Sequence, residues 1–551
     1  MAESSTRILL DRSVIRLDGR PFFAVGTRIL LTPAHRIEEA AAHIAANGFN
    51  TVITPPASLG TLPLIDLVFD AAERHGLMVI VATEPFDPEP SAYLARSFRH
   101  RQSLHSYCIP TPGDTREALL WYFRERDRLR TQDLFHPIWT PFRPGYPLDL
   151  WLESGDFYAV QQGVGGPLPR APLSQGAETL DLVRKEITAK RAVDRPFICY
   201  RFQASISDEA RRAGLFDSDP VVRHLPAQIE RWFPFLANLA ETPRNDFLPP
   251  DADLLRVRIY EILAQRVRGL LADCYEFLLG PPPTTGRDRL AELSLIAREI
   301  QTCSEFYSEG RFIDAEVETG HPRLRAALLA HGDDVLLLLW RSAQGDEYWI
   351  DPSRMHRVEV SLSLPASFGY DAWRIDFPAP TPVSLTRDGN GTLRLRLQSI
   401  DISARVLLTS SRTRIEEIEA SMRTAFPQAC ATLLEGTGHR LEKVSFVESE
   451  LAQLATGQRQ EAIIALARQQ LDDARALLEG NDPANAWELA QECRQTLRGI
   501  VNNQMVAALS SSARQSEGIE RLELLRHSYF TLPIFYRESS REDEKSLIDY
   551  T

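Results

Sequence analysis

Residues 18–26 read DGRPFFAVG, a turn followed by the apolar run Phe22 to Val25, and a regular alternation follows this stretch. The elements it predicts are the helix Ile37–Ala46, the strand Phe49–Thr54, the helix Leu62–His75 and the strand Leu77–Ala82. Asn47-Gly48 and Gly76 stand where helix C-terminal caps are expected. Because short connections between strands and helices impose parallel pairing with right-handed crossovers, this stretch predicts a parallel α/β fold.

The same alternation continues to about residue 305. Further strands are predicted at Leu104–Ile109, Phe135–Thr140, Asp156–Val160, Pro196–Phe202 and Gly269–Tyr275. Further helices are predicted at Arg116–Thr131, Glu178–Lys190, Leu254–Arg266 and Leu290–Phe306. Eight strands with intervening helices match a TIM (β/α)8 barrel, which we assign to residues 15–308. Residues 207–250 exceed a normal connection and predict an insertion with its own helix near Pro226–Leu239.

The pattern changes twice after the predicted barrel. Residues 309–411 alternate with a period of two and carry the turn sequence DGNG, which predicts a small antiparallel β-sandwich. Residues 412–510 predict a helical hairpin or bundle with a sharp turn at Gly480-Asn481-Asp482-Pro483. Residues 511–551 are polar and charged and are predicted to form an extended tail, in which the apolar segment Phe530 to Pro533 is expected to dock on another part of the protein.

Composition narrows the classes of partner. The net charge of −13 argues against nucleic acid, whose phosphates favour a basic surface. No apolar run is long enough for a transmembrane helix, so no membrane partner is expected. No secretory signal is visible, which indicates a cytoplasmic protein, or a secreted one if a leader has been removed. The cysteines form no C-x-x-C pair, and neither a metal nor a cofactor is expected.

Three stretches resemble one enzyme family. They are DGRPFFAVG at residues 18–26, GFNTV at residues 48–52 and AAERHGLMV at residues 71–79. All three resemble the glycoside hydrolases of the clan that includes β-galactosidases and cellulases, in which D-G-x-P-F-x-x-x-G starts the barrel. The resemblance is good over residues 15–85 and continues in order to about residue 305. It implies carbohydrate as the partner and, for a retaining enzyme, two carboxylates about 5–5.5 Å apart.

The resemblance also implies where those carboxylates belong, one after the fourth strand and one after the seventh. Here the fourth strand is followed by Pro110-Thr111-Pro112, and the seventh by Gln203. Threonine cannot protonate a glycosidic oxygen near neutral pH. The nearest acids that follow are Asp114 and Asp208. The sequence therefore predicts a barrel that lacks the usual acid/base and nucleophile.

Other residues are candidates for the predicted barrel mouth. Glu84 and Glu276 follow the third and eighth strands and form either a relocated catalytic pair, or hydroxyl-binding groups, or solvated loop acids. The candidates for substrate binding are Tyr107, Trp139, Tyr200, Gln203 and Tyr275. Aromatic rings stack on the C–H faces of sugars, but alternate strand residues also fill a barrel interior.

The sequence is compatible with three functions. The first is a carbohydrate-binding or structural protein, a pseudoenzyme on a glycoside-hydrolase-like barrel. The second is an active, divergent glycoside hydrolase that cleaves O-glycosyl bonds with relocated carboxylates. A third hypothesis gives the working role to the helices within residues 412–510, as a surface for a protein partner or for self-association.

Overall fold

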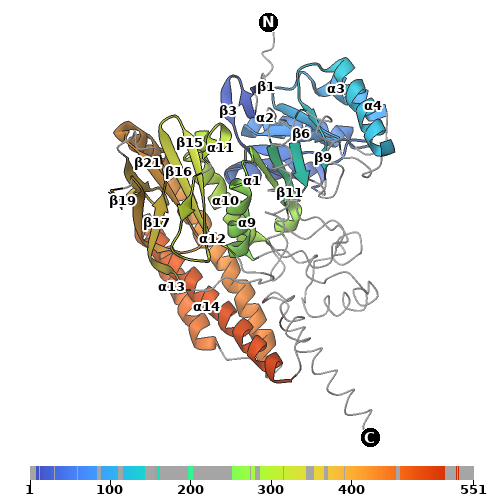
Figure 1. The fold of residues 1–551 in the computed structure, drawn as a ribbon. Helices are drawn as coiled ribbons and strands as arrows, with labels where there is room; N and C mark the ends of the chain where they lie inside the picture. The colour runs from blue at the N-terminus through green and yellow to red at the C-terminus, as the bar shows by residue number, and fades with distance from the viewer. Residues whose placement is uncertain are drawn as a thin grey trace.

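The computed structural model describes residues 8–11, 13–29, 32–58, 60–83, 89–109, 116–142, 156, 158–161, 197–202, 251–272, 275–279, 286–313, 315–342, 353–364, 370–389, 391–453, 460–515, 529 and 532. Within these residues the protein combines a parallel sheet, an antiparallel sheet and long C-terminal helices (Figure 1). It is a mixed α/β protein, as the sequence predicted.

Nine short strands of the described residues form one parallel sheet. In sheet order they are β8 (Ile138–Trp139), β7 (Leu104–Cys108), β6 (Met78–Ala82), β5 (Thr51–Ile53), β4 (Ala24–Arg28), β12 (Gly269–Ala272), β11 (Phe197–Phe202), β10 (Tyr158–Gln161) and β9 (Pro141–Phe142). Each neighbouring pair runs parallel. The two strands that end this order are consecutive in the chain, because Thr140 alone separates Trp139 from Pro141.

The strands lie close to their predicted positions, with two corrections. The apolar run Phe22 to Val25 is not one strand, because Phe22 ends the antiparallel strand β3 (Arg20–Phe22) and β4 begins two residues later. Tyr275 does not belong to the last strand either, since the chain turns there into the short 3-10 helix η4 (Tyr275–Leu278).

Helices cover one face of the parallel sheet. They are α1 (Ile37–Ala46), α2 (Leu62–His75), α3 (Glu89–Phe98), α4 (Arg116–Gln132), α9 (Ala252–Leu263) and α10 (Arg287–Gln301), with the short 3-10 helix η1 (Ala34–Arg36) ahead of α1. The first two have the predicted bounds, and Gly76 ends α2 in the left-handed conformation, as its position predicted (φ 67°). Helix α3 was not predicted. The predicted helices Glu178–Lys190 and Pro226–Leu239 and the insertion at 207–250 lie outside the described residues.

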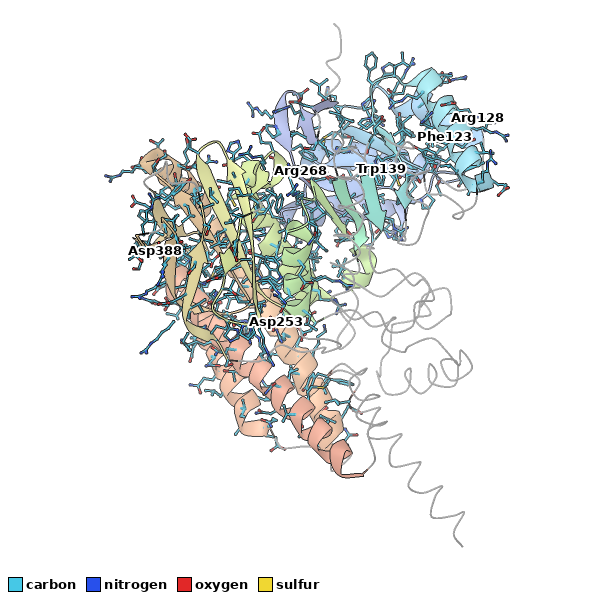
Figure 2. All side chains as sticks on the ribbon, viewed as in Figure 1. Phe123, Arg128, Trp139, Asp253, Arg268 and Asp388 are labelled. Atoms are coloured by element: carbon cyan, nitrogen blue, oxygen red, sulfur yellow. The ribbon has the colours of Figure 1, made fainter. Side chains whose placement is uncertain are left out.

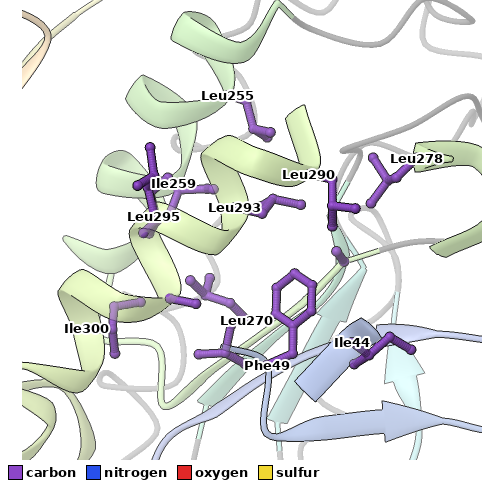
Figure 3. Close-up of a cluster of buried hydrophobic side chains, with 14 of the residues drawn as sticks. Ile44, Phe49, Leu255, Ile259, Leu270, Leu278, Leu290, Leu293, Leu295 and Ile300 are labelled. Carbon is purple, nitrogen blue, oxygen red and sulfur yellow. The ribbon is translucent and has the colours of Figure 1, made fainter. Parts of the chain in front are cut away.

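The predicted helix Leu290–Phe306 is in fact two helices. After α10, Cys303 leaves the helical conformation (φ −146°, ψ 45°), and α11 (Ser304–Ser308) follows. The core between α9, α10 and the sheet is made of aliphatic side chains around Phe49 and Leu270 (Figure 3). Burial of these side chains at about 1.5–3 kcal/mol each provides the main driving force for packing the helices on the sheet.

The opposite face of the sheet buries a separate cluster. Ala24, Ile53 and Ile80 belong to it, whereas their neighbours Val25 and Val52 pack under the helices, as expected for alternation along strands. A hairpin of β1 (Ile8–Asp11) and β2 (Val14–Leu17), extended by β3, adds Ile8 and Ile15 to the same cluster.

Residues 311–409 form an antiparallel sheet of nine strands within the described part of the chain. In sheet order they are β13 (Arg311–Ile313), β15 (Leu324–His331), β16 (Asp334–Arg341), β21 (Ser403–Thr409), β18 (Asp371–Arg374), β19 (Thr381–Arg387), β20 (Leu393–Ile400), β17 (Met355–Leu362) and β14 (Val317–Glu318). Strand β16 is buried on both faces. Leu337 and Leu339 pack toward β17 and β20, and Leu336 and Leu338 join the core that contains α9 and α10.

Three long helices complete the described structure, where the sequence predicted a hairpin or bundle. They are α12 (Arg412–Gln453), α13 (Glu461–Glu479) and α14 (Pro483–Gln515). A Cβ at Gly436 would lie 2.6 Å from Cβ of Ala291, so glycine lets α12 approach α10 closely. The predicted tail starts late, because α14 continues to Gln515, and within the predicted tail Tyr529 and Leu532 are buried. None of the described helices carries an apolar stretch that could span a lipid bilayer.

Buried charges connect these helices to the parallel-sheet region. Asp253 on α9 accepts hydrogen bonds from Nη1 of Arg440 (2.6 Å), Nη2 of Arg494 (2.9 Å) and Nε of Arg498 (2.8 Å). Arg498 also binds Asp401 between β20 and β21 at 2.6 Å. Asp253 therefore lies at a junction of α9, α12, α14 and the antiparallel sheet (Figure 2).

Candidate functional site

In parallel α/β sheets, ligands bind at the carboxyl ends of the strands, where the last residue of each strand lies. Arg28 ends β4 and is 6% exposed. It lies four residues after Ala24 and shares that residue's face of the sheet, the face opposite the helices. A buried guanidinium at this edge needs a polar or anionic partner. The sequence carries one signal for it, a charged residue at the end of an apolar run.

The residues of the family-like motifs have structural roles at the start of this sheet. A Cβ at Gly26 would lie 2.4 Å from the carbonyl oxygen of Thr51, so only glycine permits the observed spacing of β4 and β5. The Asn50 side chain accepts a hydrogen bond from the Val25 amide and donates one to the Phe23 carbonyl, each at 2.8 Å. These residues position the strands and do not themselves supply an acid or a nucleophile.

Trp139 lies inside the buried cluster on the face away from the helices. It is 0% exposed, and its Nε1 donates to Oγ of Ser106 at 2.9 Å. His105 Nδ1 lies 2.9 Å from the same Oγ, and burial lowers the pKa of His105 to about 3. The imidazole is therefore neutral at physiological pH, and the three side chains form a buried polar group within an apolar interior.

Tyr107 faces the helix layer. Its hydroxyl donates to Oδ2 of Asp133 at 3.0 Å, and His136 Nδ1 lies 2.7 Å from the same oxygen. Burial by itself would raise the pKa of Asp133, but the hydrogen bond and charge of His136 outweigh it and lower the pKa to about 2. Asp133 and His136 lie between α4 and β8, at the amino end of the strand, which is the edge of the sheet opposite the expected ligand site.

Tyr275 lines a cavity of about 530 Å³ between α1, α10 and α12. Its hydroxyl lies 2.6 Å from Nδ1 of His43, and burial lowers the pKa of His43. The polar residues around the cavity include Arg36, Asn47, Arg287 and Glu435. These side chains include hydrogen-bond donors and acceptors, and they carry both positive and negative charge. The cavity therefore suits a neutral ligand with several hydroxyl groups. Tyr275 was among the residues predicted from the sequence, whereas His43 was not, because its partner is 232 residues away.

Several predicted site residues cannot be compared with the geometry. Glu84 and Gln203 lie outside the described residues. Glu276 is in η4 and Tyr200 is in β11, but their side chains are not among those described. No group of three or more His, Cys, Asp or Glu side chains in the described ranges is arranged to hold a metal ion.

These features define a class: a multidomain α/β protein with a parallel sheet, a buried arginine at the carboxyl edge of that sheet and a polar cavity between α1, α10 and α12. No protein-family model and no curated protein matches the chain. Among solved structures, one match is a β-galactosidase from the Antarctic haloarchaeon Halorubrum lacusprofundi (12% identity, TM-score 0.36, 53% of this chain).

A second match is a cycloisomaltooligosaccharide glucanotransferase from Paenibacillus sp., complexed with cycloisomaltoheptaose (8% identity, TM-score 0.45, 70% of this chain and 85% of that chain). A third is a β-galacturonidase from Eisenbergiella tayi bound to galacturonate (13% identity, TM-score 0.34, 51% of this chain and 50% of that chain). The first match, to the β-galactosidase, spans 59% of the length of that enzyme. With TM-scores below 0.5, these likenesses carry no argument about the site.

Proposed function

We propose that the parallel sheet is a closed (β/α)8 barrel of glycoside-hydrolase type that binds carbohydrate but lacks the usual acid/base and nucleophile. Closure is supported by the strand order, whose end strands β8 and β9 flank the single residue Thr140. In this proposal residues 15–308 are the barrel, residues 309–411 are a β-sandwich and residues 412–510 are a helical bundle that offers a surface for a partner or for self-association.

One observation carries the proposal. Counted from β4 around the sheet, with β8 and β9 taken as one strand, β7 is the fourth strand and β11 the seventh. The residues that follow them are Pro110-Thr111 and Gln203, with no carboxylate before Asp114 and Asp208. A retaining glycosidase needs an acid and a nucleophile on either side of the anomeric carbon, and neither threonine nor glutamine supplies either near neutral pH.

The residues proposed to contact a sugar differ in how well the structure supports that role. Tyr275 is favoured because it lines a cavity and its hydroxyl already pairs with His43. Tyr107 and Trp139 are fully buried, which favours packing over stacking on a ligand. Tyr200 and Gln203 stay predictions from the sequence.

The competing function is a divergent hydrolase that uses Glu84 and Glu276. The experiment that separates the two combines a screen of chromogenic glycosides with direct binding of neutral oligosaccharides by calorimetry, on the full chain. The variants are Glu84→Gln and Glu276→Gln, with Asp114→Asn as the matched control.

The proposal expects binding of an oligosaccharide and no hydrolysis that depends on either glutamate. Hydrolysis lost in Glu84→Gln or Glu276→Gln but kept in Asp114→Asn would replace it with the active-hydrolase function. Absence of binding to every oligosaccharide in the panel would reject carbohydrate recognition.

A further inference from the structure

A second cavity, of about 720 Å³, lies in the antiparallel sheet, far along the chain from the proposed barrel. It is formed where β14 ends, β15 begins, β16 ends and β17 begins. Strands β15, β16 and β17 belong to the yellow part of the ribbon in Figure 1. Because the ends of four strands meet here, β-sheet backbone surrounds the cavity.

The cavity is lined by basic side chains. They are His321, Arg323, Arg341, Arg354, His356 and Arg357. Among the described lining residues the acid is Glu359, which already accepts a hydrogen bond from Nε of Arg396 at 2.8 Å. The described residues of the lining therefore carry a positive net charge, in a protein whose net charge is −13.

Three of these arginines lack a protein partner. Within the described part of the chain, the guanidinium groups of Arg323, Arg354 and Arg357 form no ion pair and no hydrogen bond, and the Nε atom of Arg354 is buried. Some arginines elsewhere on the same sheet are paired with acids. These include Arg374 with Asp376 at 2.7 Å and Arg394 with Asp388 at 3.4 Å. Three arginines without a partner therefore line one cavity.

The backbone at the cavity is also unusual. Arg357 has a φ of 54°, in the left-handed region that residues with a Cβ seldom occupy, although it lies inside β17. Arg341, which is 5% exposed, is held by a hydrogen bond from Nη1 to the Ser353 carbonyl at 2.8 Å. Backbone strain of this kind is often found at ligand-binding positions, where the surrounding structure maintains it.

We infer that this cavity is an oxyanion-binding site for a ligand that carries carboxylate or phosphate groups. Guanidinium groups match the planar, two-oxygen geometry of these anions and bind them through paired hydrogen bonds. The rest of this acidic protein repels anions, so binding must depend on the local cluster. The inference does not rest on the function proposed for the barrel.

The test uses isothermal titration calorimetry on the full chain with three probes. Trigalacturonate supplies carboxylates on a sugar, inorganic phosphate supplies a free oxyanion, and maltotriose is the neutral control of similar size. The variant is the double substitution Arg354→Gln and Arg357→Gln. Its control is Arg325→Gln, an exposed arginine on β15 that does not line the cavity.

We expect at least one anionic probe to bind, with affinity that falls as salt is added. The double variant should weaken that binding at least tenfold, and Arg325→Gln should leave it within about twofold. Preference for trigalacturonate over phosphate would identify an acidic saccharide as the ligand, and the reverse would identify a free phosphate group.

The inference is overturned if neither anion binds, if maltotriose binds as tightly as trigalacturonate at this site, or if the double variant binds as the parent does. Binding of maltotriose that survives the double variant belongs to the proposed barrel site, so the two proposals can fail separately. Circular dichroism of the double variant verifies that the sheet is intact.

Discussion

Arg498 on α14 donates from Nε to Oδ2 of Asp253 on α9 across 2.8 Å, although 245 residues separate them. The side chains of both residues are almost completely buried, at 2% and 3% exposure. Burial by itself would raise the pKa of Asp253, but the charges of Arg440, Arg498 and Arg494 outweigh it and hold that pKa well below its usual value. One carboxylate thus compensates charges from two C-terminal helices, which makes these helices part of the same buried structure as α9.

Replacement of Asp253 should therefore destabilise the whole protein. Asp253→Asn leaves Arg440, Arg494 and Arg498 with less compensating charge in a buried position, which we expect to lower the free energy of unfolding by about 3 kcal/mol or more. The measurement is urea unfolding followed by circular dichroism. Asp472→Asn is the control, because its pair with Arg475 is exposed and its loss should change stability by less than about 0.5 kcal/mol. Equal stability of the two variants would contradict the role given to Asp253.

Stability should also fall in acid for the same reason. The pKa values of Asp253, Asp288 and Asp401 are all lowered in the folded protein, by neighbouring cations that outweigh the effect of burial. The unfolded chain, with aspartate pKa values of about 3.9, therefore binds more protons, and the stabilisation is lost as the pH falls below about 4 through the folded pKa values. Asp251, Asp334 and Glu448, whose pKa values burial raises, oppose this trend.

Unfolding free energies of the parent and Asp253→Asn between pH 3 and pH 7 provide the check. The parent curve should be steeper than that of the variant below about pH 4, because one of the three acids has been removed. Parallel curves would show that Asp253 does not contribute to the acid sensitivity.

Replacement by alanine should destabilise the protein at Gly26 and stabilise it at Gly499. A Cβ at Gly26 would meet the Thr51 carbonyl at 2.4 Å, so β4 and β5 must separate, and we expect a loss of about 1–3 kcal/mol. Gly499 lies inside α14 with nothing within 4 Å of its added Cβ, so alanine should stabilise the helix by up to about 1 kcal/mol. Thermal unfolding of both variants tests this, and a stable Gly26→Ala would refute the close approach of the strands.

Substitutions of Tyr275 and Tyr107 should distinguish a residue that binds a ligand from one that packs in the core. Tyr275→Phe removes the hydroxyl that meets His43 in the cavity and should weaken oligosaccharide binding several-fold, with a stability loss of about 1 kcal/mol. Tyr107→Phe removes the bond to Asp133, a carboxylate that keeps its contact with His136. It should lower stability by about 1 kcal/mol and leave binding unchanged. Calorimetric titration of both variants checks the difference, and an equal loss of affinity would remove Tyr275 from the site.

The sequence predicts some helices and strands of this protein better than others. Ile37–Ala46 and Leu62–His75 have the predicted bounds because their apolar spacing and their capping glycines are local signals. Helix Glu89–Phe98 was missed, since proline and acidic residues surround its first turn. The candidate acids Glu84 and Glu276 were chosen by position after strands, and their roles stay predictions.

The sequence alone determined the alternation of strands and helices, the change to an antiparallel pattern after residue 309 and the long helices that follow, because each depends on periodicity within one segment. Tertiary structure alone decided that β8 and β9 lie at the two ends of one sheet order, that His43 meets Tyr275 and that Asp253 gathers three arginines. Contacts of this kind join residues hundreds of positions apart, and their energies depend on burial and exact charge geometry, which no local pattern encodes.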